Sequence, residues 1–282
     1  MNRTQNAHSE DAGEEAIDTT YDDVQYYRLY EWLGKYYPES DLVYRSSQAM
    51  HRFRIVLEEL RPFAREGRRL LDAGCGTGLY AIEYCKMGGR VHGVDISEDH
   101  IKRARARTKG RFSGASFDVL DLQKEVDWDE RFDTVLFTEV LEHLNHPDVA
   151  IRNLANVLEA NGYMIVTTPT PLHHSKRISW SYLREVLDGR KVLELHKYQT
   201  KGWAPEEYGA PNFVYRHSGF YPKGSKKWIE SFGFKCLYYY TISSHIPGIR
   251  KATKAIPLPV LRALYPLNLF GCYNLQLFIR TP

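Results

Sequence analysis

The sequence predicts a single α/β domain with a parallel sheet, and three observations support that prediction. An apolar run at residues 70–73 leads directly into closely spaced glycines, which is typical of a buried parallel strand that turns sharply into a helix. Further short apolar runs alternate with helical segments, as they do in parallel α/β sheets. The chain has 282 residues, 43% of them hydrophobic, and is therefore long enough to bury a large core in one such unit.

The elements of the predicted sheet follow one another along the chain. Residues 46–63 form an amphipathic helix before the first strand, and residues 80–87 form a helix after it that Gly88-Gly89 ends. A second strand over residues 91–95 closes with Asp95. The later strands are expected at residues 117–122, 132–137, 161–169, 234–241 and 273–280, with Asn161-Gly162 closing the helix before the fifth strand.

The spacing of the glycines after the first strand argues against a dinucleotide site. The dinucleotide fingerprint requires a third glycine at position 79, where this chain has leucine. The pattern D-x-G-x-G-x-G over residues 72–78 instead resembles motif I of the class I S-adenosylmethionine (SAM) dependent methyltransferases. That resemblance is close over roughly residues 65–170. It implies a Rossmann-like, seven-stranded sheet, mostly parallel with an antiparallel last strand, with helices on both faces and cap insertions.

The resemblance implies a SAM site at the glycine loop and at the ends of the next two strands. Asp95 can accept hydrogen bonds from both ribose hydroxyls, since an ionised acceptor makes short and strong bonds. Asp121 lies where the family places an acid or amide that faces the adenine amino group. The predicted cofactor-binding residues are Asp72, Gly74, Cys75, Gly76, Gly78, Asp95, Ile96, Asp121, Leu122 and Glu139. The expected cofactor is SAM, and S-adenosylhomocysteine is the expected product.

Methyl transfer from a sulfonium needs an aligned acceptor and, for some acceptors, a base. We predict that His143 is this catalytic base, because it follows the fourth strand at the carboxyl edge of the sheet and an imidazole has a suitable unperturbed pKa. His143 could instead cap the next element or order its loop.

A second interpretation of the same segment involves a metal. Glu139, Glu142 and His143 are similar to the E-x-x-E-H group that holds a divalent metal in the ubiquinone-biosynthesis O-methyltransferases and the small-RNA 3′-end methyltransferases. Further candidate ligands are His146, His173, His174 and His196. The additional histidine-rich motif of the RNA enzymes is absent, which argues against an RNA substrate. A divalent metal is possible but not expected, and no metal ligand is assigned.

The chain carries several segments outside the closely similar core. Residues 1–20 are polar and acidic and are expected to form a disordered tail, and residues 21–64 are expected to form an aromatic-rich helical lid. Within the methyltransferase domain at residues 65–282, an insertion at residues 170–232 is expected to cap the acceptor pocket. His217 could face this pocket or be an ordinary loop histidine, and the second is expected. A second, amphipathic insertion spans residues 243–271, where apolar and basic residues suit contact with anionic lipid, a lid or a homodimer contact.

Charge and cysteine content limit the partners and the location. A net charge of +3 predicts no nucleic-acid partner, and the basic run at residues 102–111 is expected to face solvent on a helix. The four cysteines form no C-x-x-C pair, which predicts reduced thiols and a cytoplasmic protein. No signal sequence or membrane span is predicted, so membrane association would be peripheral.

The expected function is transfer of a methyl group from SAM to a small-molecule hydroxyl of an apolar, aromatic or isoprenoid/lipid-type acceptor. Three alternatives stay open at this point. They are an O-methyltransferase of a sugar or polyketide, a SAM-binding protein without transfer activity, and a nucleotide-dependent oxidoreductase, against which the missing third glycine argues.

Overall fold

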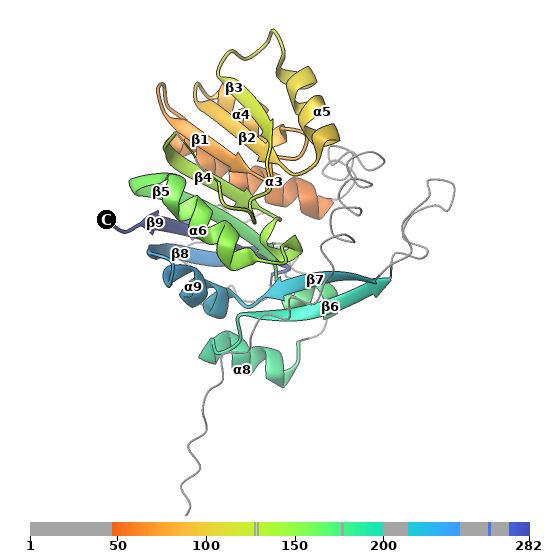
Figure 1. Ribbon diagram of the computed structural model, residues 1–282. Coiled ribbons are helices and arrows are strands. Elements are labelled where there is room, and N and C mark those ends of the chain that lie inside the picture. Colours follow the sequence, from red (N-terminus) through yellow and green to blue (C-terminus); the bar gives the residue numbers. More distant parts are fainter. Residues whose placement is uncertain are drawn as a thin grey trace, which may run out of the picture.

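The computed structural model describes residues 47–126, 128, 130–175, 178–199, 214–242, 259–260 and 271–282. Its central sheet consists of β1 (Arg69–Ala73), β2 (Arg90–Asp95), β3 (Ala115–Val119), β4 (Phe132–Thr138), β5 (Leu158–Pro169), β8 (Phe234–Ile242) and β9 (Tyr273–Arg280). The strand order is β3-β2-β1-β4-β5-β9-β8 (Figure 1). Strands β1 to β5 pair in parallel, whereas β9 is antiparallel to both of its neighbours. The predicted mostly parallel sheet with an antiparallel last strand is confirmed.

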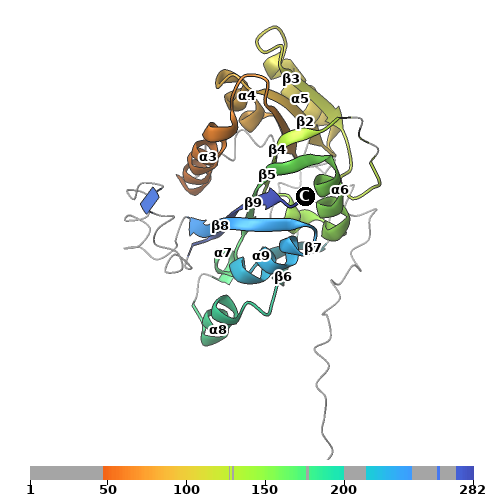
Figure 2. The same ribbon diagram turned by 90° about the vertical axis from the view of Figure 1, so that its left-hand side faces the viewer.

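Helices cover both faces of this sheet, as Figures 1 and 2 show. One face packs on α3 (Ser47–Leu60), α4 (Leu79–Lys86) and α5 (Glu98–Thr108), and the other on α6 (Pro147–Val157) and α9 (Pro222–Glu230). The neighbouring residues Leu70 and Leu71 of β1 are both fully buried, and each belongs to a different apolar cluster. A central parallel strand is apolar on both sides because both of its faces are covered.

Two strand boundaries differ from the prediction. β3 ends at Val119, so Asp121 and Leu122 lie in the loop after it. β5 begins at Leu158, directly after α6 ends, and Asn161 lies inside the strand with φ +63°. The register between β4 and β5 shifts next to this point. The Asn161-Gly162 pair tolerates positive φ. Instead of ending a helix, as expected, the pair lies at an irregularity within β5.

The helix that precedes the sheet is held by a buried acid. Glu59 is 1% exposed, and its carboxylate accepts hydrogen bonds of 2.5 Å from the hydroxyls of Tyr238 and Tyr240 on β8. The predicted helix is confirmed as α3 followed by the single turn η1 (Arg61–Phe63). Because its end is fixed to β8, α3 presents its earlier residues to the carboxyl edge of the sheet in a defined orientation.

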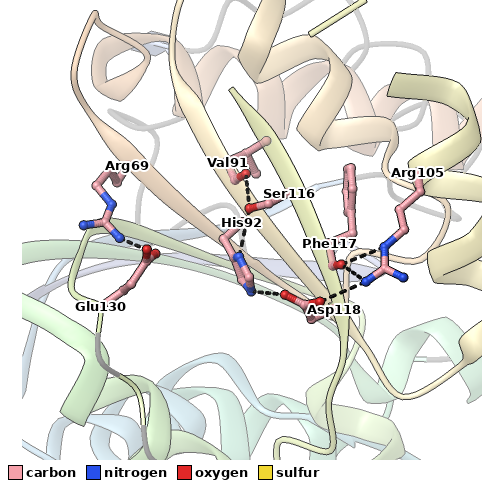
Figure 3. Close-up of polar contacts among 8 residues, drawn as sticks. All are labelled: Arg69, Val91, His92, Arg105, Ser116, Phe117, Asp118 and Glu130. Carbon is pink, nitrogen blue, oxygen red and sulfur yellow. Dashed lines mark hydrogen bonds and ion pairs between the residues drawn. The ribbon is translucent and has the colours of Figure 1, made fainter. Parts of the chain in front are cut away.

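Polar side chains link β2, β3 and α5 at the edge of the sheet (Figure 3). His92 Nδ1 lies 2.9 Å from Ser116 Oγ and its Nε2 lies 3.5 Å from Asp118, which in turn accepts a 2.8 Å hydrogen bond from Arg105. Within the predicted basic face, Lys102 is exposed and pairs with Glu98 of its own helix. Arg105, by contrast, is tied to the sheet, so the basic run is only partly a solvent face.

The insertion between β5 and β8 contains α7 (Pro171–Ser175), α8 (Trp180–Asp188) and a two-stranded antiparallel sheet of β6 (Leu193–Gln199) and β7 (Val214–Phe220). Figures 1 and 2 both place α8 and this hairpin at the end of the molecule opposite to β3 and α5. β7 approaches α7 closely, since a Cβ at Gly219 would lie 2.8 Å from the nitrogen of Pro171. The short turn η2 (Leu141–His143), which follows β4, meets β7.

Several predicted segments fall outside the described residues. They are the tail at residues 1–20, most of the lid at residues 21–64, and most of the insertion at residues 243–271. In the part of the chain that is described, no helix combines the length and the apolar character needed to cross a membrane. The four cysteines, all described, are free thiols.

Candidate active site

The glycine loop crosses the carboxyl ends of β1 and β2 in a conformation that requires glycine. Gly74, Gly76 and Gly78 have φ values of +78°, +52° and +77°. The backbone N–H groups of Gly74 and Cys75 both donate to the carbonyl of Val94, at 2.8 and 2.9 Å. A Cβ at Gly74 would lie 2.2 Å from Val140 Cγ2, so the loop is packed directly against the segment that follows β4. Glycine is therefore required at position 74 both by the positive φ and by the close approach of Val140.

Asp95 holds the glycine loop from the end of β2. Its Oδ2 accepts a 2.9 Å hydrogen bond from the Gly76 N–H, and its Oδ1 accepts one of 2.9 Å from the Ser97 N–H. His100 Nδ1 lies 3.3 Å from the same Oδ1. A carboxylate offers about four lone-pair sites, so these contacts leave capacity for a ribose hydroxyl. The sequence places Asp95 near the loop but does not indicate its hydrogen bond with Gly76. The contact of Asp95 with ribose stays a prediction.

Arg107 supports the loop from α5, and the sequence did not reveal it. Its Nη1 donates to Thr77 Oγ1 at 2.8 Å, across 30 positions of the chain. Two predicted cofactor residues are buried: Asp72 of β1 is 1% exposed and Cys75 of the loop is 6% exposed. Ile96 follows Asp95 and is half-buried.

The loop after β3 is fixed beside Asp95. The N–H of Leu120 donates to the carbonyl of Asp95 at 3.0 Å, and Asp121 Oδ1 accepts from the Gln123 N–H at 3.0 Å. Leu122 is buried, and its carbonyl accepts a 2.8 Å bond from Asn153 of α6. The structure thus brings Asp95, Asp121 and Leu122 to one edge, as the sequence predicts, although Asp121 lies in a loop and not on a strand.

Glu139 lies directly after β4 and forms an ion pair with α3. It has φ +54°, which is uncommon for a residue with a side chain. Its Oε2 lies 3.0 Å from Arg52 Nη1, and its Oε1 accepts a 2.9 Å bond from Thr167 Oγ1. The Arg52 guanidinium carbon in turn lies 4.4 Å from the ring centroid of Tyr273 on β9. Arg52 is not among the site residues predicted from the sequence. The available signal was the presence of an arginine on a predicted amphipathic helix.

Glu142, His143 and His217 form a second cluster next to this ion pair. Glu142 Oε1 lies 3.7 Å from His143 Nε2 and 4.0 Å from His217 Nε2, and the two imidazole rings are 4.8 Å apart between centroids. His217 lies on β7, so the expectation of an ordinary loop histidine is wrong. The hairpin packs its strand against η2 and thereby carries His217 from the insertion into the site.

The electrostatics of this cluster fit a bound cation. Burial, and next the charge of Glu139, raise the pKa of Glu142 well above its usual range. Burial lowers the pKa of His143 to about 4, so the imidazole is neutral at pH 7. Glu142 Oε2 is buried and has no hydrogen-bond partner among the described residues. One carboxylate and two imidazoles whose ligand atoms lie within 4.8 Å of one another can hold a divalent metal ion.

The other histidines proposed as extra ligands lie elsewhere or outside the described side chains. The backbone N–H of His146 donates to Gln123 Oε1 at 2.8 Å, and His173 packs on the Tyr273 ring at 5.0 Å. His196 of β6 is the cross-strand neighbour of His217. The side chain of His174 is not among those described.

Comparisons with known proteins agree with this geometry. A family model described as a methyltransferase domain matches residues 45–238, more than half of the chain. The ubiquinone biosynthesis O-methyltransferase of Alkalilimnicola ehrlichii is 32% identical over 139 residues, which are 49% of this chain and 54% of that protein. The protein of the same name from Pelagibacter ubique is 33% identical over 135 residues, 48% and 53% of the two chains. The chain thus spans about half the length of the curated relatives it matches.

Solved structures share the fold. A SAM-dependent methyltransferase from Mesorhizobium loti aligns with a TM-score of 0.56 and 18% identity over 80% of this chain and 96% of that one. The glycopeptide N-methyltransferase MtfA, solved with SAM, aligns with a TM-score of 0.52 and 15% identity over 80% and 87% of the two chains. The family match, the glycine loop with its Asp95 support and the strand order lead to one assignment: this chain belongs to the class I SAM-dependent methyltransferases.

Proposed function

We propose that the protein transfers the methyl group of SAM to a hydroxyl oxygen of a small, apolar or aromatic acceptor of the isoprenoid or lipid type. One observation carries this proposal. The segment that holds Glu139, Glu142 and His143 is packed against the glycine loop through the contact of Val140 with Gly74. A group able to activate a hydroxyl therefore lies beside the proposed cofactor site and not at a distance from it.

The proposed cofactor site divides into two ends. Asp95 and Asp121 mark the nucleoside end, whereas Gly74, Glu139 and Arg52 mark the methionine end. Arg52 has a buried Nε–H without a hydrogen-bond partner among the described residues, and its guanidinium is the candidate for the methionine carboxylate. The backbone at Glu139 supports its assignment to this end, because its neighbour Val140 touches the loop.

Activation of the acceptor is assigned to the cluster of Glu142, His143 and His217. A divalent cation held there would lower the pKa of an acceptor hydroxyl and so ease its attack on the methyl group. The residues themselves supply one buried carboxylate and two imidazoles. His143 as a general base is the alternative, and its pKa of about 4 makes it a weak proton acceptor at neutral pH.

The apolar nature of the acceptor is supported by two facts. The sequence relatives are named ubiquinone biosynthesis O-methyltransferases. The insertion also exposes large apolar side chains, since Trp180 is 87%, Leu187 65% and Ile178 41% exposed. Exposed apolar residues beside Arg184 and Arg190 suit peripheral contact with a membrane that carries such an acceptor.

The experiment that tests the function is transfer of radiolabelled methyl from SAM into a cell extract, followed by partition into organic, aqueous and acid-precipitable fractions. Label in the organic phase is expected, and it should disappear with EDTA and return with Mg²⁺. Label confined to the aqueous phase would replace the apolar acceptor with a sugar or other polar metabolite. Saturable SAM binding with no label in any fraction would contradict transfer altogether.

A further inference from the structure

The Arg52–Glu139 ion pair lies between the proposed methionine end of the cofactor site and the proposed cation cluster. Glu139 is three residues before Glu142, and Arg52 projects from α3, where its neighbour Phe53 packs on Tyr80 of α4 with ring centroids 4.8 Å apart. α4 begins directly after the glycine loop. The ion pair therefore has the proposed cation cluster on its acidic side and the proposed methionine end on its basic side.

Both charges are buried, and each one currently neutralises the other. The Arg52 side chain is 15% and the Glu139 side chain 20% exposed, and their charged atoms are 3.0 Å apart. Glu139 is also held by Thr167, so it does not belong to the three-residue cluster of Glu142, His143 and His217. Besides burial, the charge of Glu139 acts on Glu142 and helps to raise its pKa, so a cation in that cluster would attract Glu139 as well.

The cost of an unpaired buried charge decides how the two ligands affect each other. If the carboxylate of SAM took Arg52 while no cation was bound, Glu139 would lose its charged partner in a buried place. If a cation took Glu139 while no SAM was bound, Arg52 would lose its charged partner. Removing one partner of a buried pair is strongly destabilising, whereas replacing both partners leaves every charge compensated.

We propose that Arg52 and Glu139 form an exchangeable ion pair that makes the binding of SAM and of a divalent cation mutually favourable. The inference rests on the proposed function, which supplies both ligands. In the exchange, Arg52 turns from Glu139 to the carboxylate of SAM, and Glu139 turns from Arg52 to the cation beside Glu142. The coupling is reciprocal, so each ligand must raise the affinity of the other by the same factor.

Calorimetric titration of the full chain measures this coupling without turnover. S-adenosylhomocysteine, which has the same methionine carboxylate, is titrated in EDTA and in saturating Mg²⁺, and Mg²⁺ is titrated with and without S-adenosylhomocysteine. Mg²⁺ is expected to lower the Kd of S-adenosylhomocysteine by about tenfold, with the same factor in the reverse experiment. Equal Kd values with and without the second ligand would overturn the inference.

Two variants give opposite signatures. Glu139→Gln keeps the size of the side chain but removes its charge, so it should bind S-adenosylhomocysteine in EDTA more tightly than the unmodified protein and should no longer respond to Mg²⁺. Arg52→Met should bind Mg²⁺ more tightly without S-adenosylhomocysteine, and again show no coupling. Arg61→Met is the matched control, because Arg61 pairs with Glu58 on the exposed surface at 3.3 Å and should leave the coupling intact.

The outcomes separate the inference from the proposed function. Failure of the unmodified protein to bind S-adenosylhomocysteine would contradict the cofactor site, and failure to bind Mg²⁺ would contradict the cation cluster and the coupling with it. Binding of both without coupling would contradict the exchange alone. If Glu139→Gln weakens S-adenosylhomocysteine binding while its melting temperature is unchanged, Glu139 holds the cofactor directly and the exchange is wrong.

Discussion

The substitution of Gly74 by alanine tests whether the glycine loop and the segment after β4 are in direct contact. A Cβ at this position would lie 2.2 Å from Val140 Cγ2, well inside van der Waals distance. Gly67, in the turn before β1, offers a matched control. Its φ of +80° is nearly the same as the +78° of Gly74, but a Cβ there has no neighbour within 4 Å.

The two substitutions share the backbone cost and differ in the steric cost. An alanine in the left-handed region costs about 1–2 kcal/mol at either position. Only Gly74→Ala adds the overlap with Val140, which is expected to cost about 1–3 kcal/mol more, as in other overpacked sites. Because Val140 is the neighbour of Glu139, the displacement should also reach the methionine end of the site.

The assay is urea unfolding for the free energy of unfolding, combined with calorimetric measurement of the SAM Kd. Gly74→Ala should be less stable than Gly67→Ala and should bind SAM more weakly, whereas Gly67→Ala should keep the affinity of the unmodified protein. The double variant Gly74→Ala/Val140→Ala should recover part of both losses. Equal destabilisation by the two alanines, with equal SAM affinity, would refute the contact and the reasoning built on it.

Three further predictions follow from the site. Asp95→Ala should weaken SAM binding at least tenfold, because the glycine loop loses a charged acceptor worth about 1.5–3 kcal/mol, while Asp118→Ala at the exposed edge of β3 should not. EDTA should suppress methyl transfer and Mg²⁺ restore it, and His217→Ala should require more Mg²⁺ for half-maximal rate; full activity in EDTA would exclude the cation. Because the pKa of His143 is lowered in the folded protein, only the unfolded chain binds this proton between about pH 6.5 and 4. In EDTA, the free energy of unfolding should therefore fall by up to about 3 kcal/mol as the pH drops through that window. His143→Gln should flatten that slope in urea unfolding, and an unchanged slope would contradict the assignment.

The proximity of the glycine loop and Asp95, where we propose that the cofactor binds, could be predicted because these residues end consecutive parallel strands. The glycine loop follows β1 directly and Asp95 ends the next strand, so local patterns place both at one edge of the sheet. The Asn161-Gly162 boundary could not be predicted in the same way. A pair of residues that tolerates positive φ is compatible both with the end of a helix and with an irregularity in a strand, and only the pairing with β4 decides between them.

The remaining site residues depend on contacts between distant segments. Arg52 meets Glu139 across 87 positions, and Arg107 meets Thr77 across 30. An arginine on a helix gives no indication of which acid or hydroxyl it will reach, because that depends on how the helix is docked on the sheet. The position of His217 depends in the same way on the path of the insertion, which lies outside the glycine-loop motif.

One half of the site comes from consecutive elements and the other from distant segments, so the two halves can vary independently. The glycine loop, Asp95 and Asp121 belong to consecutive elements of the sheet, and a change in any of them alters the platform for SAM. The rest of the proposed site is assembled from parts that lie far apart in the chain: α3 supplies Arg52, β7 supplies His217 and β9 supplies Tyr273, on which Arg52 packs. A substitution in the hairpin can therefore move His217 relative to Glu142 without touching the glycine loop, so variation of the insertion should change acceptor choice and cation dependence while the cofactor stays the same.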